Sequence, residues 1–297
     1  MKKINVGIAG GAGYTGGELL RILVHHPEVH ISFVHSSSNA GKPVSAVHTD
    51  LVGDTDLLFT SSFSENIDLL FLCVGHHESK KILAEQPISA SVCIIDLSQD
   101  FRLTPNATIG DRTFVYGLPE LNREKITTAK NIANPGCFAT AIQLALLPLA
   151  KAGLLQDIYT TGITGSSGAG QSLSATSHFS WRANNIQAYK TLDHQHVFEI
   201  VQSLNQLQSD APLSTSGEGS GLHFVPWRGD FTRGIYTSSV MDCSLPLEAI
   251  QEMYANYYAA HPFVVVSETP IHLKQVVNTN KCVLQIEKQG NKLVLHS

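Results

Sequence analysis

The chain has 297 residues, a formal net charge of −5 and 43% hydrophobic residues, which is the composition of an ordinary globular protein. It has no run of Lys and Arg, which argues against nucleic acid as a partner. Its apolar runs are far shorter than the ~20 residues of a membrane span. Five widely spaced cysteines, without a Cys-x-x-Cys pair, indicate neither a disulfide framework nor a cysteine zinc site. With no signal-peptide pattern at the N-terminus, we expect a cytoplasmic protein.

The length allows two domains, and the pattern of elements changes near residue 135. Before that point, short buried strands alternate with helices, as in a parallel, doubly wound sheet. After it, the predicted strands are rich in β-formers and less regularly separated by helices. We therefore predict an α/β chain with a Rossmann-like dinucleotide-binding domain over residues 1–134. An α+β substrate domain with a mixed, mainly antiparallel sheet is predicted over residues 135–297.

A glycine-rich turn follows the first predicted strand and begins a helix (GGAGYTGGELL). Gly10, Gly13 and Gly16 are spaced by three residues. Glycines let the backbone approach a pyrophosphate, and the N-terminus of the following helix receives the phosphates. We predict that these glycines bind a dinucleotide together with Tyr14 and Thr15. A glycine-rich turn without a ligand is the alternative.

The second predicted strand, residues 29–35, ends in small hydroxyl side chains. An Asp or Glu there would bind the ribose 2′-OH of NAD. Ser36, Ser37 and the nearby Lys42 suit a 2′-phosphate instead, so NADP is predicted over NAD. A polar turn without this role is the alternative. Gly75 follows the next strand, at the sheet edge where such folds bind ligands, and is also predicted to contact the cofactor.

Cys137 lies at a predicted strand-to-helix corner. An apolar run ends at Asn134, Pro135 and Gly136 form a turn, and a helical pattern extends from residue 138 to about 150. The N-terminus of a helix favours thiolate over thiol, which makes Cys137 a candidate nucleophile. The alternative is a buried structural cysteine.

Two histidines and a glutamate begin another predicted helix, after a long polar segment at residues 171–195. The i, i+3 spacing puts His196 and Glu199 on one helix face, as suits an acid/base oriented by a carboxylate. His194 lies two residues before His196. Two imidazoles and one carboxylate are a weak metal set, and we predict no metal. A solvated helix start without chemistry is the alternative.

Two further features could bind anions. A second glycine-rich loop (GSSGAG), containing Ser167 and Gly168, can surround an anion with backbone N–H groups. Arg102 is an isolated cation in a stretch with few others, so it is a candidate anion contact. A surface arginine paired to Asp96 or Asp100 is the alternative.

A dinucleotide site, a thiolate candidate and a His/Glu pair together suit interconversion of an aldehyde and an acyl group through a thioester. The thiolate attacks an activated acyl group and the leaving group departs. Hydride then reduces the thioester, while a histidine protonates or stabilises the oxygen. The Gly/Ser loop and Arg102 would suit phosphate as the leaving group.

Nearly the whole chain resembles the N-acetyl-γ-glutamyl-phosphate reductase family of arginine biosynthesis. The resemblance is carried by six motifs: GGAGYTGGEL at 10–19, DLSQDFRL at 96–103, YGLPEL at 116–121, NPGC at 134–137, SGAG at 167–170 and HQHVFEI at 194–200. It implies an NADPH-dependent reductase that converts N-acetyl-γ-glutamyl phosphate to the semialdehyde and phosphate. It also implies a homo-oligomer, often a tetramer.

The resemblance further implies roles for individual residues. Cys137 would form the thioester, His194 or His196 would be the acid/base, Glu199 would contact the substrate or the imidazole, and Arg102 would contact an anion. The chain has Gln171 where the family usually has a cation, and Gly75 where proline is common. Members usually continue into a helix that packs beside the nicotinamide, and this helix is absent from the sequence, which stops at Ser297.

Two other interpretations remain open. The first is a related acyl-phosphate reductase acting on an N-succinyl-glutamyl, aminoadipyl or aspartyl substrate, which residues 171–195 would discriminate. The second is a non-catalytic NADP-binding sensor, which would not need a reactive Cys137.

Overall fold

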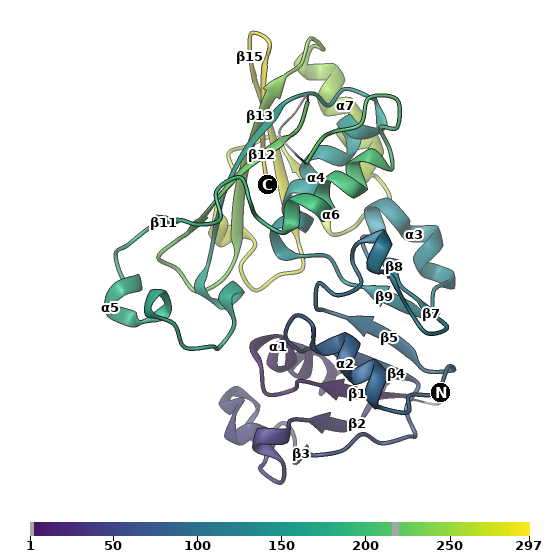
Figure 1. The fold of residues 1–297 in the computed structure, drawn as a ribbon. Helices are drawn as coiled ribbons and strands as arrows, with labels where there is room; N and C mark the ends of the chain where they lie inside the picture. Colours follow the sequence, from purple (N-terminus) through teal and green to yellow (C-terminus); the bar gives the residue numbers. More distant parts are fainter. Residues whose placement is uncertain (1–2, 216–219) are drawn as a thin grey trace. The chain divides into compact units, whose positions relative to one another are not determined.

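The computed structural model describes residues 3–215 and 220–297. The chain divides into two compact units, residues 1–135 and 136–297 (Figure 1). This division falls one residue beyond the predicted boundary. Among the described residues, no helix has the length and apolar character needed to cross a membrane.

The first unit is built on a seven-stranded sheet in which every neighbouring pair is parallel. Its strands are β1 (Ile4–Ala9), β2 (Val29–His35), β3 (Phe59–Thr60), β4 (Leu69–Leu72), β5 (Cys93–Asp96), β8 (Val115–Tyr116) and β9 (Asn131–Ala133). They lie in the order β3-β2-β1-β4-β5-β9-β8. The prediction of a doubly wound parallel sheet is confirmed.

Three α-helices and smaller elements complete this unit. The helices are α1 (Tyr14–Leu23), α2 (Glu78–Glu85) and α3 (Pro119–Thr128). A small hairpin pairs β6 (Thr108–Ile109) with β7 (Arg112–Thr113), and short 3-10 helices cover Ser37–Asn39, Val44–Ala46, Thr49–Leu51 and Thr104–Asn106.

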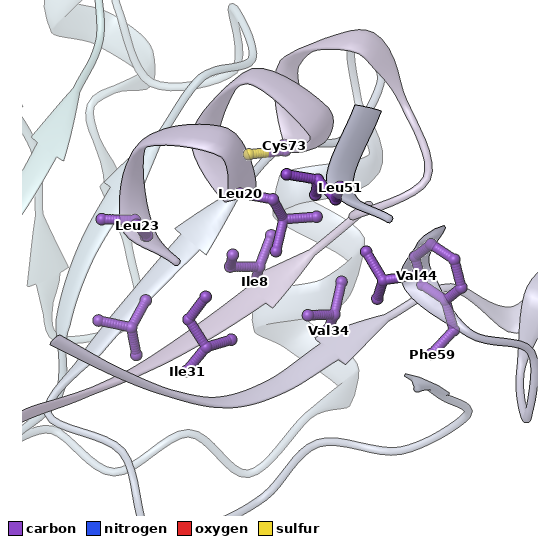
Figure 2. Close-up of a cluster of buried hydrophobic side chains, with 10 residues drawn as sticks. Ile8, Leu20, Leu23, Ile31, Val34, Val44, Leu51, Phe59 and Cys73 are labelled. Carbon is purple, nitrogen blue, oxygen red and sulfur yellow. The ribbon is translucent and has the colours of Figure 1, made fainter. Parts of the chain in front are cut away.

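Apolar side chains on both sides of the parallel strands hold this unit together. Figure 2 shows one such cluster, in which Leu20 of α1, Ile8 of β1 and Val34 of β2 pack together with Leu51 and Phe59 from the segment after β2. Burying an aliphatic side chain of this size contributes about 1.5–3 kcal/mol. The burial explains the near-continuous apolar runs in the sequence.

The strand order reverses direction beside β1. The chain passes from β1 to β2 and β3 on one side, then returns to place β4 and β5 on the other side. In such sheets, ligands bind outside the carboxyl ends of the strands at the point of reversal. Gly10 directly follows β1, and Gly75 lies just after β4, so both residues lie at this edge.

The second unit contains a mixed sheet of seven strands: β10 (Ile158–Thr164), β11 (Gln187–Ala188), β12 (Leu222–Arg228), β13 (Ile235–Asp242), β14 (Val264–Ser267), β15 (Cys282–Gln289) and β16 (Lys292–His296). Their order is β11-β12-β10-β13-β16-β15-β14. The β10–β12 and β14–β15 pairs are parallel and the other pairs are antiparallel, as predicted.

Helices α4 (Cys137–Lys151), α6 (His196–Asn205) and α7 (Leu247–Tyr258) pack against this sheet (Figure 1). The polar segment at residues 171–195 includes a 3-10 turn (Ala175–Ser177), helix α5 (Phe179–Arg182) and the short strand β11. Two further 3-10 turns cover Ser166–Ala169 and Leu273–Gln275.

Helix α4 is nearly all buried and contains a proline. Pro148 has no N–H and therefore cannot donate to the carbonyl of Leu144, one turn earlier. The hydroxyl of Tyr258 in α7 donates to that carbonyl instead, and the hydroxyl of Tyr254 donates to the carbonyl of Ala145. Two tyrosines of α7 therefore supply donors to α4 around its proline.

Candidate active site

The glycine-rich turn after β1 has no room for a side chain at Gly10 or Gly16. Gly10 has φ +74°, and a Cβ atom there would lie 2.4 Å from the carbonyl oxygen of Cys73. A Cβ on Gly16 would lie 2.7 Å from the Cα of Gly11. Gly13 precedes α1, and no side chain caps that helix, so its first N–H groups can face phosphate oxygens. The turn, including Tyr14 and Thr15 at the helix start, therefore fits a dinucleotide.

Ser36, Ser37 and Lys42, which are predicted to bind the 2′-phosphate, follow the carboxyl end of β2. Asn39 joins them, because its Nδ2 lies 3.4 Å from Ser36 Oγ and its Oδ1 accepts a hydrogen bond from Lys42 Nζ at 3.2 Å. Ser37 Oγ lies 3.4 Å from His35 Nε2. This edge carries a cation and several hydroxyls, which suits a phosphate. At Gly75, an added Cβ would meet nothing within 4 Å.

Arg102 is buried rather than on the surface. Its Nε donates to the carbonyl oxygen of Asn134 at 2.9 Å, and its Nη2 donates to that of Leu97 at 3.0 Å. These bonds join the loop after β5 to the end of β9. The carboxylate of Asp100 accepts from the backbone N–H groups of His77 and Lys80, at the start of α2.

Cys137 is the first residue of α4, at the predicted corner, and is exposed. It lines a cavity of about 340 Å³ together with Ser167 and Gly168 from the turn after β10. Because Cys137 is exposed, the interpretation of this residue as a buried structural cysteine is wrong. Cys73, by contrast, is buried, and its burial raises the pKa of its thiol to about 12.

The remaining walls of this cavity were not predicted from the sequence. They come mainly from β13 and from the segment between β14 and β15 and include Tyr236, His272, Gln275, Lys281 and Cys282. No local motif marks this segment, which has the composition of an ordinary polar connection.

The predicted pairing of His196 with Glu199 is present. His196 Nε2 lies 3.7 Å from Glu199 Oε1, and both side chains are buried. Glu199 Oε2 accepts a hydrogen bond from the backbone N–H of Gly136 at 3.1 Å. The carboxylate thus bridges the imidazole and the residue just before Cys137.

His194 is also buried, among aromatic rings. Its ring centroid lies 5.8 Å from that of Phe138, 5.5 Å from that of Phe224 and 4.6 Å from that of His196. Its Nδ1 accepts a hydrogen bond from the backbone N–H of His196 at 3.2 Å. Burial, with a smaller effect of the Lys190 charge, lowers the pKa of His194 to about 4, so the ring is neutral at pH 7.

Sequence reasoning missed Tyr189 and Arg228, which extend this cluster. The Tyr189 ring lies 5.6 Å from that of His194, and the Arg228 guanidinium lies 4.5 Å from the centre of the Tyr189 ring. Burial raises the pKa of Tyr189 to about 12, and the charge of Cys137 contributes to the increase. The polar character of residues 171–195 was the available signal for Tyr189, whereas no motif in the sequence marks Arg228, the last residue of β12.

No group of three or more His, Cys, Asp or Glu side chains in residues 3–215 and 220–297 could hold a metal ion.

Two family models match the two units. Residues 5–129 match the model described as semialdehyde dehydrogenase, NAD binding domain. Residues 137–297 match the model described as semialdehyde dehydrogenase, dimerisation domain. The two matches together cover most of the chain.

Curated relatives resemble the chain over almost its full length. The N-acetyl-gamma-glutamyl-phosphate reductase of Christiangramia forsetii is 51% identical over 99% of this chain and 88% of the relative. The protein of the same name from Flavobacterium johnsoniae is 51% identical over 99% of this chain and 89% of the relative.

Solved structures share the fold at much lower identity. Aspartate semialdehyde dehydrogenase II from Vibrio cholerae has a TM-score of 0.70 and 17% identity, covering 99% of this chain and 92% of that chain. Aspartate semialdehyde dehydrogenase with NADP from Candida albicans has a TM-score of 0.70 and 16% identity, covering 100% of this chain and 93% of that chain.

Proposed function

Because the chain belongs to the N-acetyl-γ-glutamyl-phosphate reductase family of semialdehyde dehydrogenases, we propose that it reduces N-acetyl-γ-glutamyl phosphate to N-acetylglutamate 5-semialdehyde and phosphate. The observation that carries the proposal is the position of Cys137. Its thiol is exposed at the N-terminus of α4, and the neighbouring Gly136 is hydrogen-bonded to the carboxylate that faces His196.

Cys137 is the proposed nucleophile. The N-terminus of α4 favours a negative charge on its sulfur. The thiolate attacks the γ-carbonyl carbon, and the carbon–oxygen bond to phosphate breaks, leaving a thioester on Cys137. Ser167 and Gly168 line the same cavity, and we expect their backbone N–H groups to contact the substrate there.

His196 is the proposed acid/base, with Glu199 as its partner. A buried carboxylate 3.7 Å from the imidazole orients the ring and stabilises its protonated form. His194 is neutral and uses Nδ1 to accept from the backbone, so it serves as a positioning residue beside His196.

Arg102 is the proposed contact for the leaving phosphate. Its hydrogen bonds to the carbonyls of Asn134 and Leu97 hold the guanidinium in a fixed position. A fixed cation of this kind favours a dianion nearby.

NADP(H) is the proposed cofactor, and when bound it supplies the hydride that reduces the thioester. Gly10, Gly13, Tyr14, Thr15 and Gly16 would hold the pyrophosphate at the start of α1. Ser36, Ser37 and Lys42 would bind the 2′-phosphate, and Gly75 leaves open space at the same edge of the sheet. We further propose a cytoplasmic homo-oligomer formed through residues 137–297, which match a dimerisation domain.

The test is phosphate-dependent reduction of NADP⁺ with N-acetylglutamate 5-semialdehyde as the substrate. N-succinylglutamate and aspartate semialdehydes are assayed alongside. We expect the highest kcat/KM with the acetylated compound, and a higher value for either of the others would overturn the proposed substrate. Turnover of none of these compounds, with Cys137 alkylated no faster than free cysteine, would favour a sensor.

We predict that Cys137→Ser abolishes turnover and leaves NADPH binding intact, because the nucleophile is lost while the glycine-rich turn is unchanged. Turnover and the dissociation constant of NADPH are measured in parallel. Cys93→Ser is the matched control, because it removes the thiol of a different cysteine, in β5, and it should retain turnover. Comparable turnover of the Cys137→Ser variant and the parent would contradict the thioester mechanism.

A further inference from the structure

Arg182 in α5 has two buried nitrogens, Nε and Nη2, that lack a hydrogen-bond partner. These atoms lie along one edge of the guanidinium group. That edge can donate two parallel hydrogen bonds to the oxygens of a carboxylate or a phosphate. A buried donor without an acceptor is costly, so the arrangement calls for an acceptor that the chain itself does not supply.

A second guanidinium lies near the first. Burial lowers the pKa of Arg182, the charge of Arg228 lowers it further, and Asp230 and Tyr189 partly offset this. Asp230 is engaged elsewhere too, since its Oδ2 accepts from the backbone N–H of Asn184 at 2.7 Å. Arg228 donates from Nη1 to Thr176 Oγ1 at 2.9 Å, a neutral partner. Two cations with one nearby carboxylate leave a positive site, which an anion would stabilise.

The positive site borders the cluster described above. Strand β11 pairs with the end of β12, with Gln187 opposite Arg228, and this pairing places Tyr189 under the Arg228 guanidinium. Tyr189 in turn contacts His194. Tyr189 therefore links the Arg228 guanidinium to the imidazole of His194, and Arg182 is close enough to both Arg228 and Tyr189 for their charges to affect its pKa. All four residues belong to the same unit as Cys137.

We propose that Arg182 and Arg228 form the subsite for the α-carboxylate of the substrate. The inference depends on the proposed function, since the glutamyl group supplies that carboxylate. The γ-phosphate is bonded to the carbon that the sulfur attacks and must lie close to Cys137. The α-carboxylate lies further along the same molecule, and its two oxygens match the free edge of Arg182.

Binding at this subsite requires a local movement. Arg182 Nε and Nη2 have almost no exposed surface, so an anion must replace the atoms that now cover them. The segment that carries Arg182 also carries Leu173, which is 101% exposed, and Phe179, which is 82% exposed. Few apolar contacts of these side chains oppose a shift of the segment.

The experiment measures protection of Cys137 from alkylation by iodoacetamide, followed by mass spectrometry of the peptide that contains Cys137. The protecting compounds are N-acetylglutamine, which keeps the α-carboxylate, and its neutral α-amide. In the parent, we expect N-acetylglutamine to protect with a dissociation constant about 10- to 100-fold lower than that of the α-amide. In Arg182→Met, we expect this difference to disappear while protection by the α-amide is unchanged.

Lys292→Met is the matched control, because it removes one cation from an exposed ion pair with Asp242 in the same unit. It should behave as the parent. If Arg182→Met does not fold, Arg182→Lys and Arg228→Met are used, and each should reduce the preference for the carboxylate at least several-fold. Arg182→Lys keeps the charge but loses the two-donor edge.

Equal protection by both compounds in the parent would overturn the proposal, as would an unchanged preference in Arg182→Met. Inorganic phosphate is the third probe. If Arg182→Met loses protection by phosphate but not by N-acetylglutamine, the subsite binds phosphate and the carboxylate assignment is wrong. The assay needs no turnover and no NADPH, so its failure is distinguishable from failure of the proposed reductase activity.

Discussion

Glu199 Oε2 accepts a hydrogen bond from the backbone N–H of Gly136 at 3.1 Å, while Oε1 of the same carboxylate lies 3.7 Å from His196 Nε2. One buried side chain of α6 therefore serves two groups. It holds the turn that precedes Cys137, and it faces the proposed acid/base.

Replacing Glu199 by Gln should separate these two roles. The amide oxygen can still accept from Gly136, so folding should change little, but the negative charge that supports a protonated His196 is lost. We expect kcat to fall about 10²-fold with a small change in KM. Glu199→Ala should additionally lower the free energy of unfolding by about 1–3 kcal/mol, because the Gly136 N–H loses its partner. Equal kcat for Glu199→Gln and the parent would exclude a role for the charge.

His196→Ala should slow turnover by about 10²–10⁴-fold, the usual range for a lost acid/base. His194→Ala should have a smaller effect on kcat, because its ring is neutral and positions its neighbour. Steady-state kinetics of both variants at pH 7 measure the difference. A larger loss of turnover in His194→Ala than in His196→Ala would identify His194 as the acid/base instead.

Stability should depend on pH through His194. Its pKa is about 4 in the folded protein, below the ordinary value of 6.5, so the unfolded chain binds more protons between these pH values. Stability therefore rises with pH across this window and is lost as pH falls from 6.5 to 4, by up to roughly 3 kcal/mol. Urea unfolding at several pH values measures the slope. His194→Gln should flatten it, and an identical slope in both proteins would contradict the assignment to His194.

Tyr258→Phe should destabilise the second unit, because the carbonyl of Leu144 already lacks a helical donor at Pro148. Leaving this buried acceptor unpaired should lower the free energy of unfolding by about 1–3 kcal/mol. Thermal or urea unfolding measures the change. Tyr159→Phe removes an exposed hydroxyl and should stay within about 0.5 kcal/mol of the parent.

The features that sequence predicts well here are local. Pro135 and Gly136 mark the corner that makes Cys137 the first residue of a helix, and the spacing of His196 and Glu199 is enough to place them on one face. The alternation of buried strands and helices likewise predicts the parallel sheet, because each strand is apolar on both faces.

The features that sequence does not reveal are contacts between distant segments. Glu199 reaches a backbone N–H 63 residues away, and no side-chain pattern records an N–H. Tyr189 lies against the Arg228 guanidinium because β11 pairs with β12, and β11 is a strand of only two residues that propensity does not predict. Arg102 uses carbonyl oxygens as partners, and these are present at every position of any sequence.

Helix α4 is held at Gly136 by Glu199 and around Pro148 by two phenol groups of α7. The backbone that carries the sulfur of Cys137 is therefore already ordered, and its conformational entropy is lost during folding rather than when substrate binds. The proposed nucleophile is then already immobilised when substrate binds, and only the substrate loses translational and rotational entropy at that step.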